Sequence, residues 1–578
     1  MIRKLAGPIR QYWLAALLSP LCMVGEVYME VKIPSIISTI VDKGIEAGNI
    51  DVVWQQGLLL ILTALCSLCF GVASAVFAAY AGTGYARNLR HDLYHRVQTF
   101  DFGNIDKIST SSIITRVTSD VANIQMCFQM MIRMAVRCPM MVILASINVY
   151  RLSPQLCLVY LLALPLLAAG LLLLTKLVFP IFDRGFKTID KLNNVVQENL
   201  HGIRVVKAFV RQDKEVEKFT QVSGTLHKDF SKAEKILAAN SPLMNLAVYS
   251  CIIAISWLGA NMIVSSGNTT FTTGNLTSMF TYTTQILSGL LMLSMVFVML
   301  TMSRSPMRRC CEILSEEPQL RSPENAATEV ADGSIEFTDV SFRYSEKAGK
   351  NALEQVNIRI EPGMTVGILG GTGSSKSTLV QLIPRLYDAT EGSVKVGGRD
   401  VREYDLKALR DQVAMVLQKN VLFSGSIKDN LRWGNPNATD EEMIHACKLA
   451  CAHDFISSFP DGYDTYIEQE GKNVSGGQKQ RLCIARALLK KPKILILDDS
   501  TSAVDTQTDA MIRKAFADQI PGTTKLIIAQ RVASVQDSDL ILIMDGGRVV
   551  AQGDHESLLA TSQIYREVYE SQKKGGEE

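Results

Sequence analysis

The amino-acid sequence predicts a two-part fold, in which a bundle of membrane-spanning helices is followed by an α/β domain built on a parallel sheet. At 578 residues the chain is too long for one ordinary domain, and its 47% hydrophobic content is high for a soluble protein. No Asp, Glu, Lys or Arg occurs from Ile236 to Ser303, whereas charges recur every few residues from Ile335 onward. A short apolar strand, Ile494 to Leu497, runs straight into two aspartates.

Six segments in the first half are long and apolar enough to span a bilayer, which takes roughly 20 residues of helix. They lie near Tyr12 to Val41, Leu58 to Ala81, Gln125 to Tyr150, Leu152 to Phe179, Leu243 to Ser265 and Leu276 to Met302. Two connections between them, Thr83 to Ile124 and Pro180 to Asn240, are long and charged and look helical with polar faces. Because Arg and Lys are plentiful in both, the positive-inside rule predicts a multi-pass membrane protein whose N- and C-termini and long connections lie in the cytoplasm.

Composition and charge argue against several functional classes. The net charge of +2 and the lack of a basic patch interleaved with aromatic residues argue against a nucleic-acid partner. The 12 cysteines show no spacing typical of metal ligands, and we interpret Cys66, Cys69, Cys447 and Cys451 as packing residues. The first apolar run carries Glu26 and leads on into more helix, so we predict no cleavable signal peptide.

Charged residues inside the predicted spans need a reason, because a carboxylate in lipid costs roughly 3 kcal/mol. Glu26 and Glu30 are four residues apart and therefore share one face of the first span. They are candidates for a polar patch in a substrate cavity that attracts cationic groups. The alternative is a structural pair, satisfied by helix neighbours or by Lys32. Arg133 and Arg137 are also four residues apart, and we interpret them as snorkelling toward phosphate headgroups.

The composition changes at a charged stretch with prolines, Arg304 to Gly333, which we interpret as a helix end followed by a linker. It divides the chain into a transmembrane domain, residues 1–303, with six helices and long cytoplasmic extensions, a linker, residues 304–333, and a second domain, residues 334–578. The second domain opens with an alternating strand, Ser334 to Arg343, and continues with a further strand, Thr365 to Leu369.

A glycine-rich loop follows this further strand. Residues 370–377, GGTGSSKS, nearly fit the G-x-x-x-x-G-K-[ST] pattern, in which backbone N–H groups and a helix N-terminus cradle phosphates. In that pattern Lys376 reaches the β and γ phosphates and the Ser377 hydroxyl binds Mg²⁺. The expected nucleotide contacts here are Gly370, Gly371, Thr372, Gly373, Ser374, Ser375, Lys376, Ser377 and Thr378.

Ser375 stands where the pattern has glycine. A side chain at this position is unfavourable if the backbone needs a conformation that only glycine adopts cheaply. We interpret the serine as tolerated, with nucleotide still bound, because the strand, the loop and the helix all match the pattern.

The strand Ile494 to Leu497 shows no polar alternation, which is typical of a strand buried on both faces inside a parallel sheet. Ligands bind at the C-terminal ends of such strands. We therefore expect Asp498 and Asp499 at the mouth of a site that the glycine-rich loop completes.

With these motifs together, the chain resembles a half-transporter of the ATP-binding cassette (ABC) exporters over essentially its full length. Val474-Ser-Gly-Gly-Gln478 resembles the family's signature motif, and Asp505, in the stretch SAVD, matches its D-loop. Gln418 matches the Q-loop, and Tyr344 matches the aromatic residue that stacks on adenine. The implied fold is a type I exporter-like membrane bundle of six transmembrane helices fused to an α/β P-loop ATPase domain.

The resemblance also implies cofactors and roles. The cofactors are ATP and Mg²⁺, with the metal held by Ser377, Gln418 and Asp498. The signature residues act on the ATP of a partner chain, because two nucleotide-binding domains of this family sandwich ATP head to tail. These residues are Ser475, Gly476, Gly477 and Gln478.

Two catalytic positions depart from the family pattern. Where the family has a glutamate that polarises the attacking water, this chain has Asp499, whose side chain is one methylene shorter. A retreat of roughly 1 Å should slow hydrolysis strongly, since attack depends on placing the water within hydrogen-bond reach. Where the family has a switch histidine, this chain has Gln530, which can donate a hydrogen bond but cannot become cationic.

Both departures and Ser375 fall in the chain's own site, whereas the signature is intact. We therefore predict one half of a heterodimeric exporter, most similar to the degenerate-site subunit of bacterial heterodimeric multidrug exporters, in the plasma membrane of a bacterial cell. Its partner is a second half-transporter with a consensus ATP site. The alternatives are a homodimeric exporter with slow turnover and an ATP-gated channel or regulator. A soluble ATPase acting on DNA or ribosomes is disfavoured by the six predicted spans.

The substrate class stays open between small drug-like molecules, lipids and hydrophobic peptides. The sixth span offers side chains that suit an adaptable amphipathic cavity, although helix packing explains them equally well. These are Thr281, Thr283, Thr284, Gln285, Met292, Met295 and Met299.

Overall fold

The computed structural model describes residues 2–345, 349–499 and 504–574. The chain forms two compact units. The first comprises Met1–Gln98 and Ser109–Glu316, and the second comprises Thr99–Ile108 and Glu317–Glu578. The second unit thus includes a short segment that lies between two membrane-spanning helices in the sequence.

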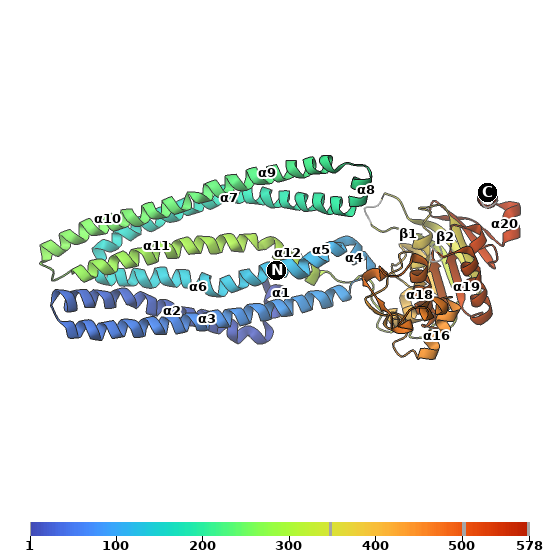
Figure 1. Ribbon diagram of the computed structural model, residues 1–578, viewed down its shortest axis with the longest axis horizontal. Helices are drawn as coiled ribbons and strands as arrows, with labels where there is room; N and C mark the ends of the chain where they lie inside the picture. The colour runs from blue at the N-terminus through green and yellow to red at the C-terminus, as the bar shows by residue number, and fades with distance from the viewer. Residues whose placement is uncertain (1, 346–348, 500–503, 575–578) are drawn as a thin grey trace. The chain divides into compact units, whose positions relative to one another are not determined.

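The first unit is entirely helical. Its described residues contain six helical rods that are long and apolar enough to cross a membrane: Lys4–Glu46, Ile50–Gln98, Thr110–Leu152, Pro154–His201, Gln212–Ser266 and Thr273–Ser315. Each predicted span falls within one of these rods, which Figure 1 shows lying side by side. The fold class predicted for the first half is confirmed.

Several rods contain short stretches of 3₁₀- or π-helix, which are labelled η. The helices are α1 (Ile2–Ala6), η1 (Gly7–Tyr12), α2 (Trp13–Thr39), η2 (Ile40–Glu46), α3 (Ile50–Gln98), α5 (Thr110–Thr115), η3 (Arg116–Asp120), α6 (Val121–Leu152), α7 (Pro154–His201), α8 (Ile203–Ala208), α9 (Gln212–Ala238), α10 (Asn240–Ser266), α11 (Thr273–Met302) and α12 (Arg304–Ser315). The start of α7 shows how the sequence sets such boundaries. Ser153 is extended and its hydroxyl accepts a hydrogen bond from the Leu156 N–H, while Pro154 occupies the first helical position.

Four helices, α2, α3, α6 and α11, pack against one another, while α7 packs against α9 and α10. A core shared by α2, α6, α7, α10 and α11 includes Val27 on α2, Ala145 on α6 and Ile286 on α11, all fully buried. Many large apolar side chains on the outside stay exposed, for example Leu162 on α7 at 78%. Such an apolar exterior is expected of helices whose solvent is lipid.

The second unit is an α/β fold with two main sheets. The strands are β1 (Ile335–Phe342), β2 (Leu353–Ile360), β3 (Thr365–Gly370), β4 (Glu391–Val396), β5 (Arg399–Asp400), β6 (Val413–Val416), β7 (Gly425–Ser426), β8 (Tyr466–Ile467), β9 (Ile494–Asp498), β10 (Thr524–Ile528), β11 (Leu540–Asp545) and β12 (Arg548–Gly553). The larger sheet has the order β12-β11-β3-β10-β9-β6, parallel except for β12 at its edge.

Helices cover both faces of this sheet, and the sheet separates two apolar cores. The helices are α13 (Lys376–Gln381), α14 (Leu406–Gln412), α15 (Ile427–Arg432), α16 (Asp440–Leu449), α17 (His453–Ser457), α18 (Gly476–Leu488), α19 (Thr506–Gln519), α20 (His555–Thr561) and α21 (Gln563–Lys574). Along β9, Ile494 and Ile496 belong to one core, and Leu495 and Leu497 belong to the other. This explains why the strand is apolar without alternation, because both of its faces are buried.

The segment between α3 and α5 contributes a short helix, α4 (Phe102–Ile108), to the second unit. Tyr387 donates a hydrogen bond from its hydroxyl to the Asp106 carboxylate (2.8 Å), and its ring lies 6.0 Å from that of Phe102. The Asp101 carboxylate accepts from the backbone N–H groups of Gln319 and Leu320 at 2.7 and 3.1 Å. Both polar and aromatic contacts therefore hold this segment in the second unit.

Candidate functional site

The glycine-rich loop joins the C-terminal end of β3 to α13. Gly370 is required by packing, since a Cβ there would lie 2.3 Å from the Met544 carbonyl oxygen of the neighbouring strand β11. Gly373 has a φ of +84°, a conformation that glycine adopts without penalty. Ser374 is buried and closes the loop by donating from its hydroxyl to the Gly371 carbonyl (2.8 Å). Sequence and packing together thus fix the backbone shape of this loop.

Ser375 adopts the left-handed conformation, with φ 70° and ψ 25°. The position therefore has the backbone geometry that glycine supplies in the sequence pattern. A residue with a Cβ pays roughly 1–2 kcal/mol to hold it. The chain adopts the pattern's loop shape, with strain at this one serine.

Lys376 folds back over the loop. Its ammonium donates to the carbonyl oxygens of Gly370 (2.7 Å) and Gly371 (2.9 Å). Burial lowers the pKa of Lys376, and the nearby carboxylates of Asp499 and Asp498 act in the opposite direction. The ammonium thus lies beside the loop, where it can move onto a phosphate oxygen.

The Ser377 hydroxyl donates to the Asp498 carboxylate across 3.0 Å. Asp498 ends β9 and is only 3% exposed. Burial raises the pKa of Asp498, and the charge of Asp499 adds to this, whereas the Ser377 hydrogen bond and Lys376 oppose it. A hydroxyl and a carboxylate in contact are the hard oxygen ligands that Mg²⁺ prefers, so these two residues fit the metal.

Asp499 and Gln530 are joined directly. The Gln530 side-chain amide donates to the Asp499 carboxylate across 3.0 Å. Asp499 itself has a φ of 49°, and its N–H donates to the Ile528 carbonyl of β10 (3.1 Å). The carboxylate that follows the metal-associated aspartate is therefore oriented by an amide of its own chain.

The loop around Gln530 is supported by α21. Gln572 donates from its amide to the Gln530 carbonyl (2.8 Å) and accepts from the Val532 N–H (2.8 Å). Sequence reasoning missed this residue, because a lone glutamine on a polar C-terminal helix gives no signal. The contact of Gln572 with the Gln530 loop becomes apparent only in the structure, where α21 packs near the end of β10.

Most of these side chains line one open cavity of about 280 Å³. Gln418, which follows β6, lines it together with residues from the β3–α13 loop and from the ends of β9 and β10. The lining residues are Thr372, Gly373, Ser375, Lys376, Ser377, Thr378, Gln418, Asp498, Asp499, Ile528 and Gln530. Gly370 and Gly371 line a neighbouring cavity of about 290 Å³ instead.

Tyr344 lies next to this cavity and is 52% exposed. Its hydroxyl is hydrogen-bonded to that of Thr378 (2.9 Å), and its ring meets Phe342 and Tyr387 edge-on at 4.9 and 5.2 Å. An exposed aromatic face held by other aromatic rings is suited to stacking on a nucleotide base.

The signature residues form the N-terminus of α18. Ser475 accepts at its hydroxyl from the Gln478 N–H (3.3 Å), and Gln478 accepts at its side-chain oxygen from the Ser475 N–H (2.9 Å). This reciprocal capping box leaves Ser475 and Gly476 exposed. Exposed N–H groups at the start of a helix favour an anion.

None of the signature residues lines the 280 Å³ cavity. Asp505 does not line it either, and it caps α19 by accepting from the Thr508 N–H (2.9 Å). Residues 500–503, which include the first two residues of the stretch SAVD, lie outside the described part of the chain. The phosphate loop and the signature of one chain are therefore two separate surfaces.

In the membrane unit, Arg137 lies in a different environment from the one that we predicted. Its guanidinium contacts the carboxylates of both Glu26 (2.6 Å) and Glu30 (2.8 Å), so the prediction that it snorkels to headgroups is wrong. Lys32 is not their partner, since its ammonium lies over the Tyr28 ring at 4.5 Å. The sequence does contain a signal for this contact, since two apolar spans carry charges of opposite sign. A helical wheel of one span does not show that the two sets of charges meet.

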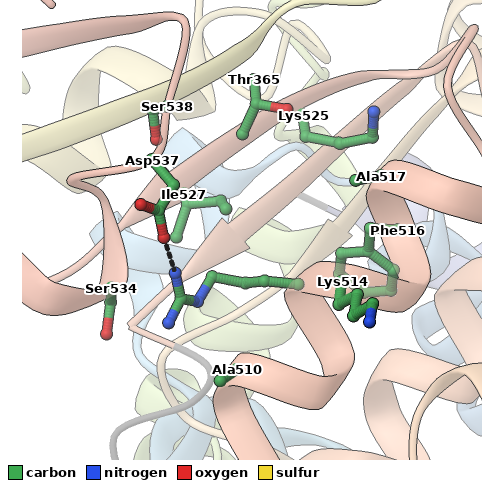
Figure 2. Close-up of a pocket in the computed structure, with 11 residues that line it drawn as sticks. Thr365, Ala510, Lys514, Phe516, Ala517, Lys525, Ile527, Ser534, Asp537 and Ser538 are labelled. Atoms are coloured by element: carbon green, nitrogen blue, oxygen red, sulfur yellow. Dashed lines mark hydrogen bonds and ion pairs between the residues drawn. The ribbon is translucent and has the colours of Figure 1, made fainter.

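Another cavity, of about 240 Å³, lies between α19 and the strands β3 and β10 (Figure 2). Arg513 on its wall is ion-paired with Asp509 (3.3 Å) and Asp537 (3.2 Å). Its lining contains no glycine, so it has no counterpart of the phosphate-binding loop. The 280 Å³ cavity is therefore the better candidate for the nucleotide site.

Comparisons with known proteins agree with this geometry. Residues 17–291 match the family model of the ABC transporter transmembrane region, and residues 353–502 match that of the ABC transporter. The chain is 35% identical to the uncharacterized ABC transporter ATP-binding protein YfiB of Bacillus subtilis, covering 99% of this chain and 98% of the relative.

A second relative is the uncharacterized ABC transporter ATP-binding protein Rv1273c of Mycobacterium tuberculosis, 32% identical over 99% of this chain and 98% of the relative. Among solved structures, a bacterial Atm1-family ABC exporter with ATP bound has the same fold. Its TM-score is 0.83 at 24% identity, covering 98% of both chains.

Proposed function

The chain belongs to the ABC transporter family, as an ATPase that couples ATP hydrolysis to transport, and from this premise we propose that it is one half of a heterodimeric exporter and carries the slower ATP site. The observation that carries the proposal is the contact between Gln530 and Asp499 in the 280 Å³ cavity. At these two positions the family has a glutamate in place of Asp499 and a histidine in place of Gln530.

On ATP binding, the backbone of the β3–α13 loop holds the phosphates, and Lys376 exchanges its carbonyl contacts for phosphate oxygens. Ser377, Asp498 and Gln418 would hold Mg²⁺, which neutralises phosphate charge when bound. Tyr344 stacks on the base. Each of these functions is served by a residue in or beside the cavity, so tight nucleotide binding is expected.

Hydrolysis is a different matter. The shorter Asp499 side chain retreats by roughly 1 Å from a water that a glutamate would reach, a displacement that can slow a reaction about 100-fold. Its carboxylate also accepts a hydrogen bond from Gln530, so that lone pair does not orient the water. Gln530 in turn offers the γ-phosphate no positive charge. The site is therefore expected to bind ATP tightly and to hydrolyse it slowly.

The signature side supports the asymmetry. Ser475 and Gln478 keep their reciprocal cap, and the helix N-terminus is exposed. In a head-to-tail dimer this surface completes the partner's site. A partner with glutamate and histidine at the catalytic positions would then hydrolyse ATP at an ordinary rate, while a second copy of this chain would give two slow sites.

Export and orientation also belong to the proposal. Membrane and ATPase parts are fused in the order typical of exporters, and both long connections are rich in Arg and Lys. We place both termini in the cytoplasm and the bundle in the cell membrane of a bacterium, and we expect an apolar or amphipathic substrate.

The test is the subunit composition of the complex purified under mild conditions from its native membrane, measured as intact and subunit mass. A 1:1 complex with a second half-transporter that has glutamate and histidine at the catalytic positions supports the proposal. A homodimer that hydrolyses ATP at ordinary transporter rates, and loses this rate with Asp499→Asn, contradicts it.

A further inference from the structure

Two carboxylates and one guanidinium meet in the middle of the membrane unit. We call Glu26, Glu30 and Arg137 the midspan cluster. From Glu26 to the end of α2, and from Arg137 to the end of α6, the helices run about 20 Å, given 1.5 Å per residue. The hydrocarbon core is about 30 Å thick. The midspan cluster therefore lies deep in the bilayer, at the same depth on both helices.

The midspan cluster carries one more negative than positive charge. Arg133, one turn from Arg137, makes no ion pair with either carboxylate, and Lys32 lies over the Tyr28 ring. From α3 the facing residue is Gly71, and from α11 it is Gln285, whose amide donates weakly to the Glu30 carbonyl (3.4 Å). Among the described residues, Arg137 is thus the one cation that contacts the two carboxylates, while Arg133 has a buried Nε without a hydrogen-bond partner.

Two acceptors at the midspan cluster are left without a hydrogen bond. They are Oε2 of Glu26 and Oε1 of Gln285, and both atoms are fully buried. A purely structural ion pair at this depth is expected to satisfy its oxygens, because each unmet acceptor costs roughly 1–3 kcal/mol. Here a negative charge and two acceptors remain for a further group.

The midspan cluster is also partly exposed in the single chain. The exposed fraction rises from 13% for the Glu26 side chain to 25% for Arg137 and 31% for Glu30. Methionines lie on the helix faces that lead to it: Met130 and Met134 precede Arg137 by two turns and one turn on α6, and Met292 follows Gln285 by two turns on α11.

Both stretches run toward the same end of the unit, because α6 begins there and α11 ends there. Methionine is flexible and polarisable, and it adapts to apolar ligands of varied shape. Methionines on α6 and α11 therefore lead from that end of the unit to the midspan cluster, and on α6 they flank Arg133.

We propose that the midspan cluster is the recognition site for the transported substrate, and that this substrate is an amphipathic organic cation with a single positive charge. The inference rests on the proposed export function. The ligand's charge neutralises the excess carboxylate, and its apolar body packs on the methionines of α6 and α11. Arg137 is the internal counter-ion that holds the two carboxylates when the site is empty.

The experiment uses the complex purified from its native membrane and measures binding of tetraphenylphosphonium without ATP. Tetraphenylborate, which has nearly the same size and shape but a negative charge, is the matched ligand. Glu30→Gln and Glu26→Gln are expected to weaken tetraphenylphosphonium binding at least tenfold and to leave tetraphenylborate binding unchanged or stronger. Glu30→Asp, which keeps the charge, should retain most of the affinity.

The control variant is Asp51→Asn, which removes a carboxylate near the end of the same unit and should change neither affinity. Elution of the complex as a single peak on gel filtration and its thermal unfolding temperature report whether each variant is folded. If Glu30→Gln binds tetraphenylphosphonium as tightly as the unaltered chain, or if both ligands weaken equally, the proposal is wrong. Subunit mass and turnover do not enter this measurement, so its failure is distinguishable from failure of the proposed function.

Discussion

The two surfaces of the second unit that we propose to face ATP differ in how closely they match the family's catalytic pattern. On the phosphate side, Ser375 is held in a left-handed conformation, and Asp499 is hydrogen-bonded to Gln530. On the signature side, Ser475 and Gln478 form a complete capping box. Departures from the catalytic pattern thus gather on the surface that serves the chain's own nucleotide. The surface offered to another chain has none, which is the pattern expected if selection acts on the partner's site through this chain.

The largest effect on ATP turnover should come from a substitution on the signature side. Ser475→Ala removes a helix cap and a hydroxyl that, in the proposed head-to-tail dimer, faces the partner's phosphate, so we expect ATP turnover of the complex to fall about 100-fold. The matched control is Thr439→Ala, which removes the equivalent capping box of α16 on the same unit. Equal losses in both variants, measured as steady-state ATPase activity, would show that only folding is affected.

A smaller effect, an increase in the hydrolysis rate, should follow from restoring the family's residues on the phosphate side. Asp499→Glu with Gln530→His restores the longer carboxylate and a side chain that can become cationic, and we expect about a tenfold faster hydrolysis at this site. Single-turnover hydrolysis of prebound ATP measures it. The single changes serve as controls and should each give less than the pair. An unaltered rate in the double variant would mean that the slow step lies elsewhere.

Much of this comparison was visible in the sequence, because phosphate binding depends on short contiguous motifs. The loop at Gly370 and the strand ending at Asp498 were predicted from local patterns, and the structure brings them together across parallel strands. Six spans were likewise predicted from composition, since lipid permits few alternatives to apolar helices.

Contacts between distant segments were not predictable in the same way. The support of Gln530 by Gln572, and the pairing of Arg137 with Glu26 and Glu30, depend on how helices pack. Neither contact follows from the periodicity of one helix. The prediction for Arg137 considered its own helix alone and was wrong, because a cation in a span can be satisfied either by headgroups or by a carboxylate on a neighbouring helix.

A further, smaller effect, on stability, should come from relieving strain in the loop. Ser375→Gly removes a penalty of about 1 kcal/mol that the loop pays for the left-handed backbone even without nucleotide, so the free energy of unfolding should rise by up to about 1 kcal/mol and ATP affinity should stay unchanged. Denaturant unfolding and equilibrium binding of ATP to the complex measure the two effects. Gln355→Gly is the control, because Gln355 also has a positive φ, 49°, but lies on β2 and does not line the cavity. Tighter ATP binding in Ser375→Gly but not in Gln355→Gly would contradict the expectation.

The smallest effect concerns pH. Burial raises the pKa of Asp498, so its carboxyl takes up a proton at a higher pH than an ordinary aspartate. Mg²⁺ needs the ionised form, and metal-dependent nucleotide affinity at this site should therefore fall as pH drops, beginning above the range where exposed aspartates titrate. Asp498→Asn should bind more weakly and without this dependence. A pH profile identical in the two forms would assign the titration to another group.

The claim that this chain holds ATP and hydrolyses it slowly can be tested by following the nucleotide that stays bound. The native complex is loaded with radiolabelled ATP and Mg²⁺, freed of unbound nucleotide by rapid gel filtration, and sampled over time for the ratio of ATP to ADP. We predict two phases of similar size, one fast and one slow, and we expect Asp499→Glu with Gln530→His to accelerate only the slow phase. A single fast phase that converts all bound ATP would contradict the account.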